Sequence, residues 1–297
     1  MFNSILGNEE NKKALENNIK KDNVLHSYMF VGKAGIGKLL FAKEFAKAIL
    51  CRSDEKPCNE CESCISFDDD NNPDVTIIDE TDKSIKTETI KEMVKGVYEK
   101  PLNSSKKIYI INDSEKMTKE AQNSLLKTLE EPPEYVVIIL VTENENLLLN
   151  TIKSRCTKIK FNGLDKNEIK QILKEKRKIE NVSENILELA QGSIEMALSA
   201  IDKEDSINVI KEIFSKIDRI NIIDLLNKKD LLFKDKDNVQ EILNYINIEL
   251  FNRINENIKY AECINIVEET KERLKRNSNY DMTIDNLLLK IWEEVNG

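Results

Sequence analysis

The chain has 297 residues, of which 40% are hydrophobic and 33% are charged, and its formal net charge is −9. This length allows two or three domains with separate cores, and the acidic balance argues against a protein that grips DNA alone, which should be basic over one face. The single histidine, His26, leaves almost nothing for Ser-His-Asp chemistry or for histidine-rich metal sites. No apolar run approaches the roughly 20 residues that cross a bilayer. Acidic and amide residues occur close to the N-terminus, which is unlike a signal peptide. We therefore expect a cytoplasmic protein with no membrane partner.

Predicted strands and helices alternate over the first half of the chain. Helical spacing of apolar residues is found over residues 8–22, 38–50, 87–99 and 118–131. Strand character is found over residues 27–32, 74–79, 107–113, 135–141 and 157–161. Alternation of this kind predicts an α/β fold with a parallel sheet covered on both faces. After Phe161 only helical patterns follow, over residues 164–178, 183–192, 193–201, 239–254 and 284–295.

The stretch VGKAGIGKLL joins the first predicted strand to the helix after it. Gly32, Gly37 and Lys38 match the phosphate-binding loop G-x-x-x-x-G-K-[ST], and Gly35 lies within it. The position after the lysine should carry a hydroxyl that holds magnesium, but it is Leu39. The strand, loop and helix context is the one that the motif requires. We therefore predict a degenerate nucleotide site, in which backbone amides and one lysine can still bind phosphates without hydrolysis.

A second nucleotide motif is expected after the strand KIYIIND, where an acidic pair would coordinate magnesium and polarise water. The pair here is Asn112 and Asp113. An amide cannot supply the negative charge that a metal ion prefers, although Asp113 can still hold a water molecule. The alternative is that both residues merely end a strand, as turn residues do. Together with Leu39, the pair removes two of the groups that handle magnesium.

A cluster of four cysteines lies in the segment CRSDEKPCNECESC. Cys51, Cys58, Cys61 and Cys64 have C-x6-C-x2-C-x2-C spacing. Four thiolates so close in sequence suit a tetrahedral structural zinc, and the alternative is a chance group of free cytosolic thiols. Four protein ligands leave no open position for catalysis. The remaining two cysteines, at positions 156 and 263, are expected to be ordinary half-buried residues.

Several motifs together resemble one known family. The segments LHSYMFVGKAGIGK, MTKEAQNSLLKTLEEPP and NTIKSRC and the four-cysteine segment occur in one order and at fitting distances. The chain resembles the delta-prime subunit of the bacterial DNA polymerase III clamp loader, a member of the AAA+ superfamily. The resemblance implies a RecA-like domain over residues 1–162 with a zinc module at 51–64, a helical lid over 163–204 and a helical collar over 205–297.

The resemblance also implies partners and site residues. The partners are motor and delta subunits in a hetero-pentameric ring, the sliding clamp and, through the complex, primed DNA. Arg155, in the motif SRC, matches the arginine that reaches into the ATP site of the adjacent subunit, and the alternative is a surface arginine paired with an acid. Thr142 aligns with a polar sensor or simply caps its strand. Glu195 stands where motor subunits often carry an arginine, and Asn150 stands where the family usually has proline.

Two main functions remain open from the sequence. The first is a non-motor clamp-loader subunit in DNA replication, a scaffold without ATPase activity of its own that donates Arg155. The second is an ATP-binding or ATP-hydrolysing protein, either a gamma/tau-like motor subunit or another AAA+ ATPase. Leu39, Asn112 and Glu195 argue against hydrolysis. A zinc-dependent DNA-binding module is a third and weaker alternative, because the chain is acidic and the four-thiolate site is closed.

Overall fold

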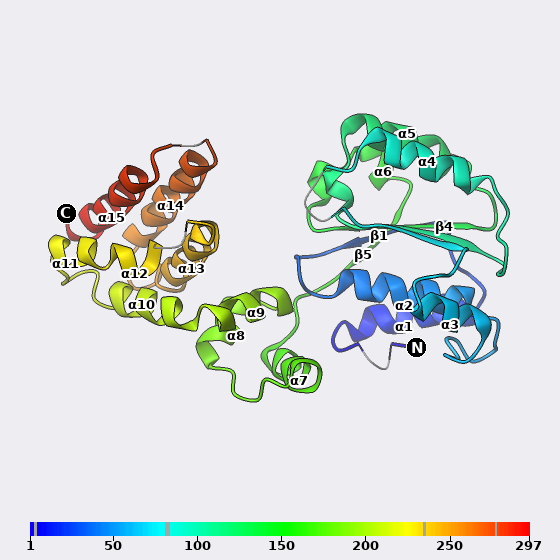
Figure 1. The fold of residues 1–297 in the computed structure, drawn as a ribbon, viewed down its shortest axis with the longest axis horizontal. Helices are drawn as coiled ribbons and strands as arrows, with labels where there is room; N and C mark the ends of the chain where they lie inside the picture. Colours follow the sequence, from blue (N-terminus) through cyan, green and yellow to red (C-terminus); the bar gives the residue numbers. More distant parts are fainter. Residues whose placement is uncertain (3–4, 81–83, 234–235, 277) are drawn as a thin grey trace. The chain divides into compact units, whose positions relative to one another are not determined.

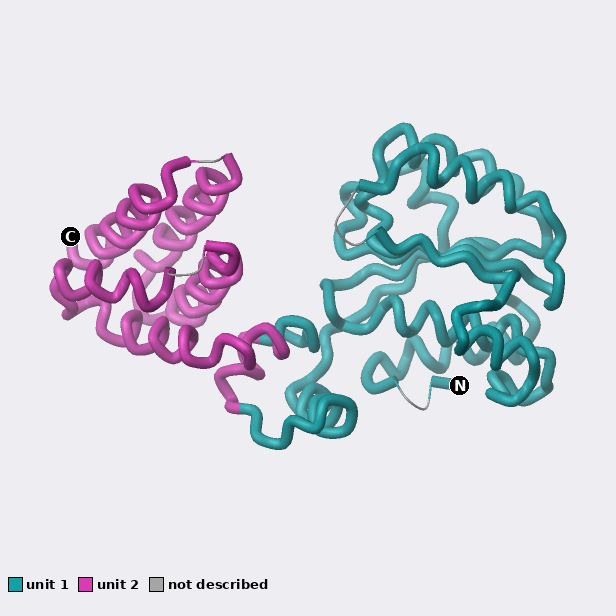
Figure 2. Tube along the Cα trace, viewed as in Figure 1, with its two compact units in different colours: residues 1–182, 190–196 teal, residues 183–189, 197–297 magenta. Residues whose placement is uncertain are grey.

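The computed structural model describes residues 1–2, 5–80, 84–233, 236–276 and 278–297 (Figure 1). The chain divides into two compact units (Figure 2). Unit 1 comprises residues 1–182 and 190–196, and unit 2 comprises residues 183–189 and 197–297. Within the described ranges, no helix is both long enough and apolar enough to span a bilayer.

Unit 1 is built on a five-stranded parallel sheet with the order β2-β3-β4-β1-β5. The strands are β1 (Ser27–Val31), β2 (Val75–Ile78), β3 (Lys107–Ile111), β4 (Val136–Thr142) and β5 (Thr157–Lys160). One face is covered by α1 (Glu9–Lys20), α2 (Lys38–Leu50) and α3 (Glu62–Asp68) (Figure 1). The other is covered by α4 (Thr87–Val97), α5 (Lys119–Glu130) and α6 (Asn150–Lys153). The predicted α/β fold with a parallel sheet is therefore confirmed.

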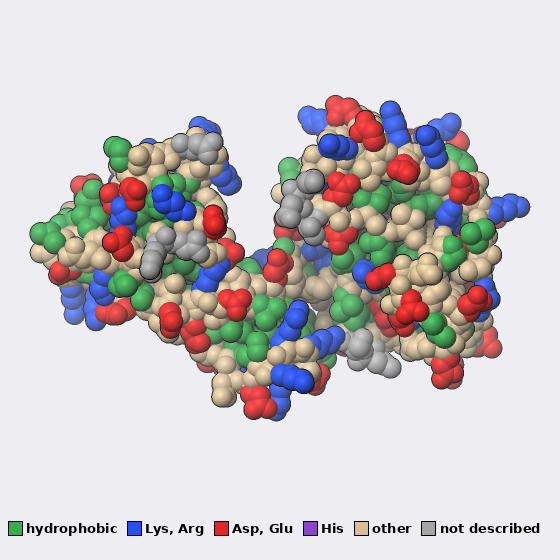
Figure 3. Space-filling model, in the orientation of Figure 1, with side chains coloured by type: hydrophobic (Ala, Val, Ile, Leu, Met, Phe, Trp, Pro, Cys, Tyr) green, Lys and Arg blue, Asp and Glu red, His purple; other side chains and the backbone are tan. Residues whose placement is uncertain are grey.

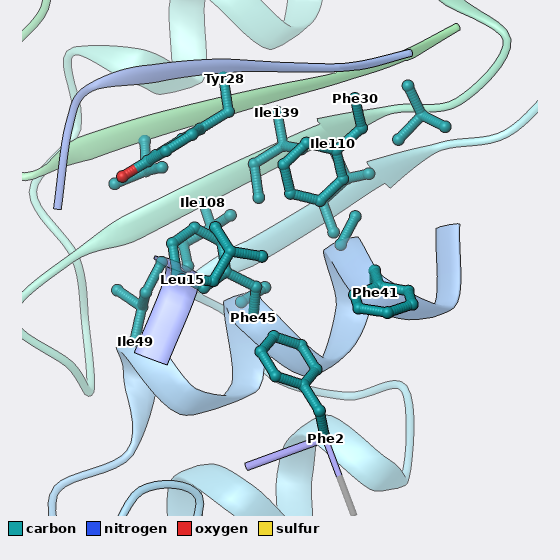
Figure 4. Packing of buried hydrophobic residues seen from close by; sticks show 14 of the residues in the cluster. Phe2, Leu15, Tyr28, Phe30, Phe41, Phe45, Ile49, Ile108, Ile110 and Ile139 are labelled. Carbon is teal, nitrogen blue, oxygen red and sulfur yellow. The ribbon is translucent and has the colours of Figure 1, made fainter. Parts of the chain in front are cut away.

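Burial on both faces explains the composition of the central strands. Every residue of β3 and β4 is buried, and the two strands consist largely of isoleucine and valine, which suit a sheet sandwiched between helices. On the α2 side the core is aromatic (Figure 4). Tyr28 of β1 meets Phe45 of α2 edge-on, with ring centroids 5.2 Å apart. This packing holds α2, which follows the glycine-rich loop, against the sheet.

Two short helices of unit 1 fall outside the predicted elements. Helix α3 begins inside the cysteine segment, and α6 precedes Arg155. Both are too short for a helical period of apolar residues to stand out in the sequence. The predicted strands and helices are otherwise displaced by a few residues at their ends, where periodicity carries least information. Two 3-10 turns also occur, at Ser114–Lys116 and Glu145–Leu147.

The rest of the chain is helical, as predicted. Helix α7 (Lys166–Arg177) belongs to unit 1, and Asp165 starts it with a capping box completed by Glu168. The following helices are α8 (Glu184–Ala190), α9 (Ile194–Asp202), α10 (Glu204–Phe214), α11 (Ile222–Asn227), α12 (Lys229–Phe233), α13 (Val239–Asn252), α14 (Lys259–Lys275) and α15 (Tyr280–Asn296). In unit 2, α13, α14 and α15 pack in sequence order around buried side chains such as Ile246, Val267 and Leu287.

Candidate functional site

The glycine-rich loop of unit 1 connects β1 to α2. Gly37 adopts φ 89° and precedes the first residue of α2, a conformation that favours glycine. Lys38 is buried, and its Nζ donates to the carbonyl of Lys33, 2.6 Å away, within the same loop. The lysine that would meet phosphates is thus folded onto the loop's own backbone. Leu39, which replaces the magnesium-binding hydroxyl, packs against the aromatic core.

The segment that begins α9 lies directly on this loop. The backbone N–H of Ile194 donates to the carbonyl of Gly35 at 2.9 Å. A Cβ added to Gly35, which has φ +68°, would lie 2.2 Å from the Ser193 hydroxyl oxygen and 2.6 Å from the Cβ of Glu195. Gly35 is therefore required both by its backbone conformation and by this close approach. The contact brings the position of Glu195 against the phosphate-binding loop.

The charges of four carboxylates affect the pKa of Lys38. Burial lowers the pKa of Lys38, and the charges of Glu143, Glu115, Asp113 and Glu195 act in the opposite direction. A phosphate group that approached Lys38 would also meet the charges of these four carboxylates, which disfavour an anion. Sequence reasoning singled out Asp113 and Glu195 but missed Glu115 and Glu143. Their signal was available, because both follow buried parallel strands whose carboxyl ends meet at one edge of the sheet.

Asn112 and Asp113, the two residues of the second motif, both contact other side chains of the chain. The side-chain amide of Asn112 donates to Asp79, 2.9 Å away, and Asp113 pairs with Lys116 at 2.8 Å. Thr142 is buried at the end of β4, and its hydroxyl accepts from the backbone N–H of Asn144 at 3.2 Å. Its carbonyl accepts from Gly32 at 3.2 Å, so the structure brings the predicted sensor position to the glycine-rich loop.

A cavity of about 360 Å³ lies beside the glycine-rich loop in unit 1. Apolar side chains from the N-terminal segment, α2, α7 and α9 make most of its lining, and two cations of α7 complete it. The lining includes Leu6, Leu40, Leu164, Ile172, Lys176 and Arg177. A concave, mostly apolar site with a few charged groups suits a small organic ligand. No sequence motif indicated this cavity, because its walls come from four separate segments.

Arg155 lies at the other end of β1 from the glycine-rich loop. Its carbonyl accepts from the hydroxyl of Ser27, the first residue of β1, at 2.6 Å, whereas Gly32 follows the last residue of that strand. Five residues of strand span roughly 16 Å, which is more than an arginine side chain reaches. Its guanidinium donates to Glu130 at 2.6 Å and to the carbonyl of Thr151 at 2.8 Å. Arg155 is therefore separated from the phosphate-binding loop of its own chain.

The four predicted metal ligands converge. Their sulfur atoms all lie within 4.8 Å of one another, so they can hold a metal ion. The Sγ of Cys51 is 3.6 Å from that of Cys58 and 4.0 Å from that of Cys61. Tetrahedral zinc with four thiolates requires sulfur atoms about 3.8 Å apart, which these distances match. The cysteines do not all lie in a loop, since Cys51 follows α2 directly and Cys64 is within α3.

Backbone donors around the cysteines favour the thiolate form that binds metal. The N–H of Cys58 lies 3.4 Å from the sulfur of Cys51, and the N–H of Cys61 lies 3.3 Å from that of Cys58. Burial opposes ionisation of Cys61, but hydrogen bonds from the backbone of Arg52 and Cys64 lower its pKa to about 6. Burial raises the pKa of Cys51 and Cys64. A bound cation would offset that cost, because coordination deprotonates a thiol.

Buried Lys47 fastens the cysteine segment to α2. Its Nζ donates to the side chains of Asn59 and Asp68, each at 2.7 Å. Asn59 lies between two of the cysteines, and Asp68 ends α3. The same helix therefore carries the glycine-rich loop at one end and the cysteine cluster at the other.

Comparison with known proteins places this geometry in a family. A sequence profile described as DNA polymerase III, delta subunit, matches residues 7–165. The delta-prime subunit of DNA polymerase III from Bacillus subtilis is 36% identical over 189 residues, covering 61% of this chain and 57% of that protein. The gamma/tau subunit from Mycoplasma genitalium is 31% identical over 319 residues, covering 99% of this chain and 53% of that protein.

Two further proteins are similar to this chain, one by sequence and one by structure. The tau/gamma subunit from Haemophilus influenzae is 33% identical over 240 residues, covering 76% of this chain and 35% of that protein. The chain thus spans between about a third and just over half of these curated relatives. A gamma-subunit-related protein from Thermotoga maritima has the same fold, with a TM-score of 0.50 and 19% identity over 95% of this chain and 99% of that one. The chain therefore belongs to the DNA polymerase III delta-subunit family.

Proposed function

We propose that the chain is the non-motor, delta-prime subunit of a DNA polymerase III clamp loader, and that it supplies Arg155 to the ATP site of a neighbouring subunit. The observation that carries this proposal is the position of Arg155 at the far end of β1 from its own glycine-rich loop. An arginine so placed can serve only a phosphate outside its own chain. Such a guanidinium neutralises charge on the transferred phosphoryl group, an effect worth about 10³–10⁵ in rate where it has been measured.

The state of the chain's own nucleotide site supports a non-motor role. Leu39 is turned into the core, Asn112 is engaged by Asp79, and Lys38 is surrounded by carboxylates. The site thus lacks magnesium ligands at two positions and disfavours the γ-phosphate. Nucleotide binding without turnover remains compatible with the apolar cavity beside the loop.

We further propose that the four cysteines hold one structural zinc ion. Bound zinc would tie the end of α2 to α3, and four thiolates leave it no open coordination site for catalysis. The chain's own part in this site is to preset the sulfur positions and to stabilise thiolates through backbone N–H groups. Lys47 would then keep the zinc module, residues 51–64, fixed to the helix that follows the glycine-rich loop.

The proposed architecture has three functional parts. Residues 1–162 form the RecA-like domain, 163–204 the lid, and 205–297 the collar through which the chain would join a hetero-pentameric ring. The partners we propose are the motor and delta subunits, the sliding clamp and, through the complex, primed DNA in the cytoplasm. On the face drawn in Figure 3, acidic and basic side chains are interspersed, so this face offers no basic stripe for gripping DNA alone.

The second candidate is a gamma/tau-like motor subunit. It is favoured by the relatives named gamma/tau and by the retained Gly37 and Lys38. The two candidates differ in whether the chain's own site turns over ATP, which Leu39, Asn112 and Glu195 argue against.

The test is a reconstituted clamp loader that contains either the natural chain or its Arg155→Ala variant, compared at equal assembly. We expect a partial loss of DNA-stimulated ATP hydrolysis and a larger loss of clamp loading, because other sites in the ring keep their own arginines. Assembly and folding should be unaffected, since a half-exposed ion pair adds about 1 kcal/mol or less to stability. Lys153→Ala, which removes a neighbouring cation from α6, is the matched control. Unchanged loading at unchanged assembly would leave Arg155 with only its structural ion pair.

A further inference from the structure

One lysine of unit 1 is buried where α2 meets the cysteine segment. Lys47, on α2, has a side chain that is only 9% exposed. Removing an ammonium group from water is costly unless it is paired and hydrogen-bonded, and an apolar side chain of similar volume would avoid that cost. The contacts of the ammonium group should therefore explain why a lysine stands at this position.

The ammonium group joins two segments that follow α2 in the chain. Its Nζ donates to Oδ1 of Asn59 and to Oδ2 of Asp68, each at 2.7 Å. Both acceptors belong to exposed residues, whereas Lys47 itself is buried. One lysine thus holds a turn of the cysteine segment and the last residue of α3 at the same time.

Helical spacing relates Lys47 and Asp68 to two of the predicted zinc ligands. Cys51 caps α2 four residues after Lys47, and its backbone N–H donates to the Lys47 carbonyl at 3.0 Å. Cys64 and Asp68 are likewise four residues apart in α3, so they lie on the same face of that helix. The contact between Lys47 and Asp68 therefore fixes the helices that carry Cys51 and Cys64 relative to each other.

The other two cysteines flank a turn that contains Asn59. This residue has φ +61°, in the left-handed region that glycine adopts most readily and that asparagine tolerates. Asparagine supplies the acceptor for Lys47, which glycine would lack. In the same turn the backbone N–H of Cys61 lies 3.3 Å from the sulfur of Cys58. The backbone that Asn59 holds thus also supports a thiolate.

We propose that Lys47 is a positioning residue of the cysteine site, which rests on the proposed structural zinc ion, and that it strengthens zinc binding through Asn59 and Asp68. Lys47 is not itself a ligand. Ligands that are held in place before the metal arrives lose less conformational freedom on binding, so the metal binds more tightly. Residues that orient metal ligands from outside the site typically change metal affinity by about 10- to 100-fold.

The test is the zinc affinity of the full chain, measured by competition with a chromophoric chelator at neutral pH under reducing conditions. Lys47→Met keeps an unbranched side chain but removes the ammonium group, and it should weaken zinc binding about tenfold. Lys43→Met makes the same change one turn earlier in α2, at a half-buried residue. It is the matched control and should leave the zinc affinity unchanged.

Asn59→Gly separates ligand positioning from general stability. Glycine keeps the left-handed backbone and removes only the acceptor, at an exposed residue, so the core of unit 1 should stay folded. We expect weaker zinc binding. The double variant should bind zinc no more weakly than Lys47→Met alone, because both changes break the same contact. If Lys47 only tied α2 to α3, its loss would lower the thermal midpoint of the metal-free chain, and Asn59→Gly would leave the zinc affinity unchanged.

Two different outcomes would overturn this role of Lys47. If the natural chain binds no zinc, the zinc site is refuted and the role of Lys47 is refuted with it. If the natural chain binds one zinc ion and either Lys47→Met or Asn59→Gly binds it equally tightly, the zinc site stands and only the positioning role is refuted. Fully additive losses in the double variant would also refute that role, because the two residues would then act separately.

Discussion

At the scale of single residues, the pairing of Arg155 with Glu130 is the contact with the clearest functional consequence. Glu130 is the last residue of α5, where a carboxylate is disfavoured by the helix dipole unless a cation is near. Arg155 supplies that cation at 2.6 Å, and the two side chains remain 32% and 49% exposed. The side chain of Arg155 is thus held by its own chain when no neighbouring phosphate is present. Acting on a neighbour requires that this ion pair open.

Glu130→Gln should release the side chain of Arg155. A part-exposed ion pair is worth about 0.2–1 kcal/mol, so its loss should make the chain about 1.4- to 5-fold more potent in stimulating the neighbouring ATP site. The measurement is the concentration of this chain that gives half-maximal DNA-stimulated hydrolysis by the remaining loader subunits. Glu131→Gln, at the adjacent exposed carboxylate, is the control. If Glu130→Gln lowers stimulation as Arg155→Ala does, Glu130 positions the arginine for catalysis.

At the scale of elements, the cysteine segment is a small module held by few contacts of its own. Between α2 and α3 the chain contributes little apolar surface, so its shape depends on Cys51, Cys64 and the Lys47 contacts. Short segments of this kind depend on metal for their structure. We expect the module to loosen without metal while the sheet and its aromatic core stay folded, because those are buried independently of the cysteines.

Cys64→Ser should reduce bound zinc from about one equivalent per chain to well below one, since three thiolates are left to hold the ion. Metal analysis after dialysis measures this. Hydrogen exchange should quicken over residues 51–72 and remain slow in β3 and β4. Cys156→Ser, at a half-buried cysteine outside the cluster, should retain full zinc. Natural protein with far less than one equivalent, and with all four thiols freely reactive, would refute the zinc proposal.

At the scale of the whole molecule, unit 1 keeps the strand–loop–helix geometry of a phosphate-binding site, while the proposed non-motor role requires that hydrolysis be absent. The β1–loop–α2 geometry, the apolar cavity beside the loop and the parallel sheet are compatible with nucleotide binding. The groups that would handle magnesium and the γ-phosphate are replaced or engaged by other residues. A subunit of this kind is expected to serve as a fixed partner for active neighbours, with its contribution made through Arg155.

The isolated chain should therefore show negligible ATP hydrolysis. With labelled ATP, binding and turnover are measured separately for the natural chain and for Lys38→Ala. Turnover should be equally low in both, while any weak binding should fall in the variant, because Lys38 is the principal cation at the loop. Glu195→Ala removes one repelling carboxylate and should strengthen binding without creating turnover. Steady hydrolysis that disappears in Lys38→Ala would favour the motor-subunit alternative.

The sequence by itself determined the features that depend on local spacing. Alternating strands and helices, the strand–loop–helix around Gly37 and Lys38, and the cysteine spacing can each be identified in a short window, because periodicity and turn residues act over a few positions. It also placed Arg155 in a recognisable motif. The sequence did not predict the exact ends of the elements or the short helices α3 and α6. A helix of a few residues is too short to show a helical period of apolar residues.

Only the tertiary structure decided which distant residues meet. Glu115 and Glu143 join Glu195 near Lys38 because parallel strands in the order β2-β3-β4-β1-β5 bring their carboxyl ends to one edge. Tyr109 of β3 likewise lies beside Gly96 of α4 only because that helix packs over the sheet. Strand order and helix packing are set by the burial of the whole core, which no short stretch of sequence encodes.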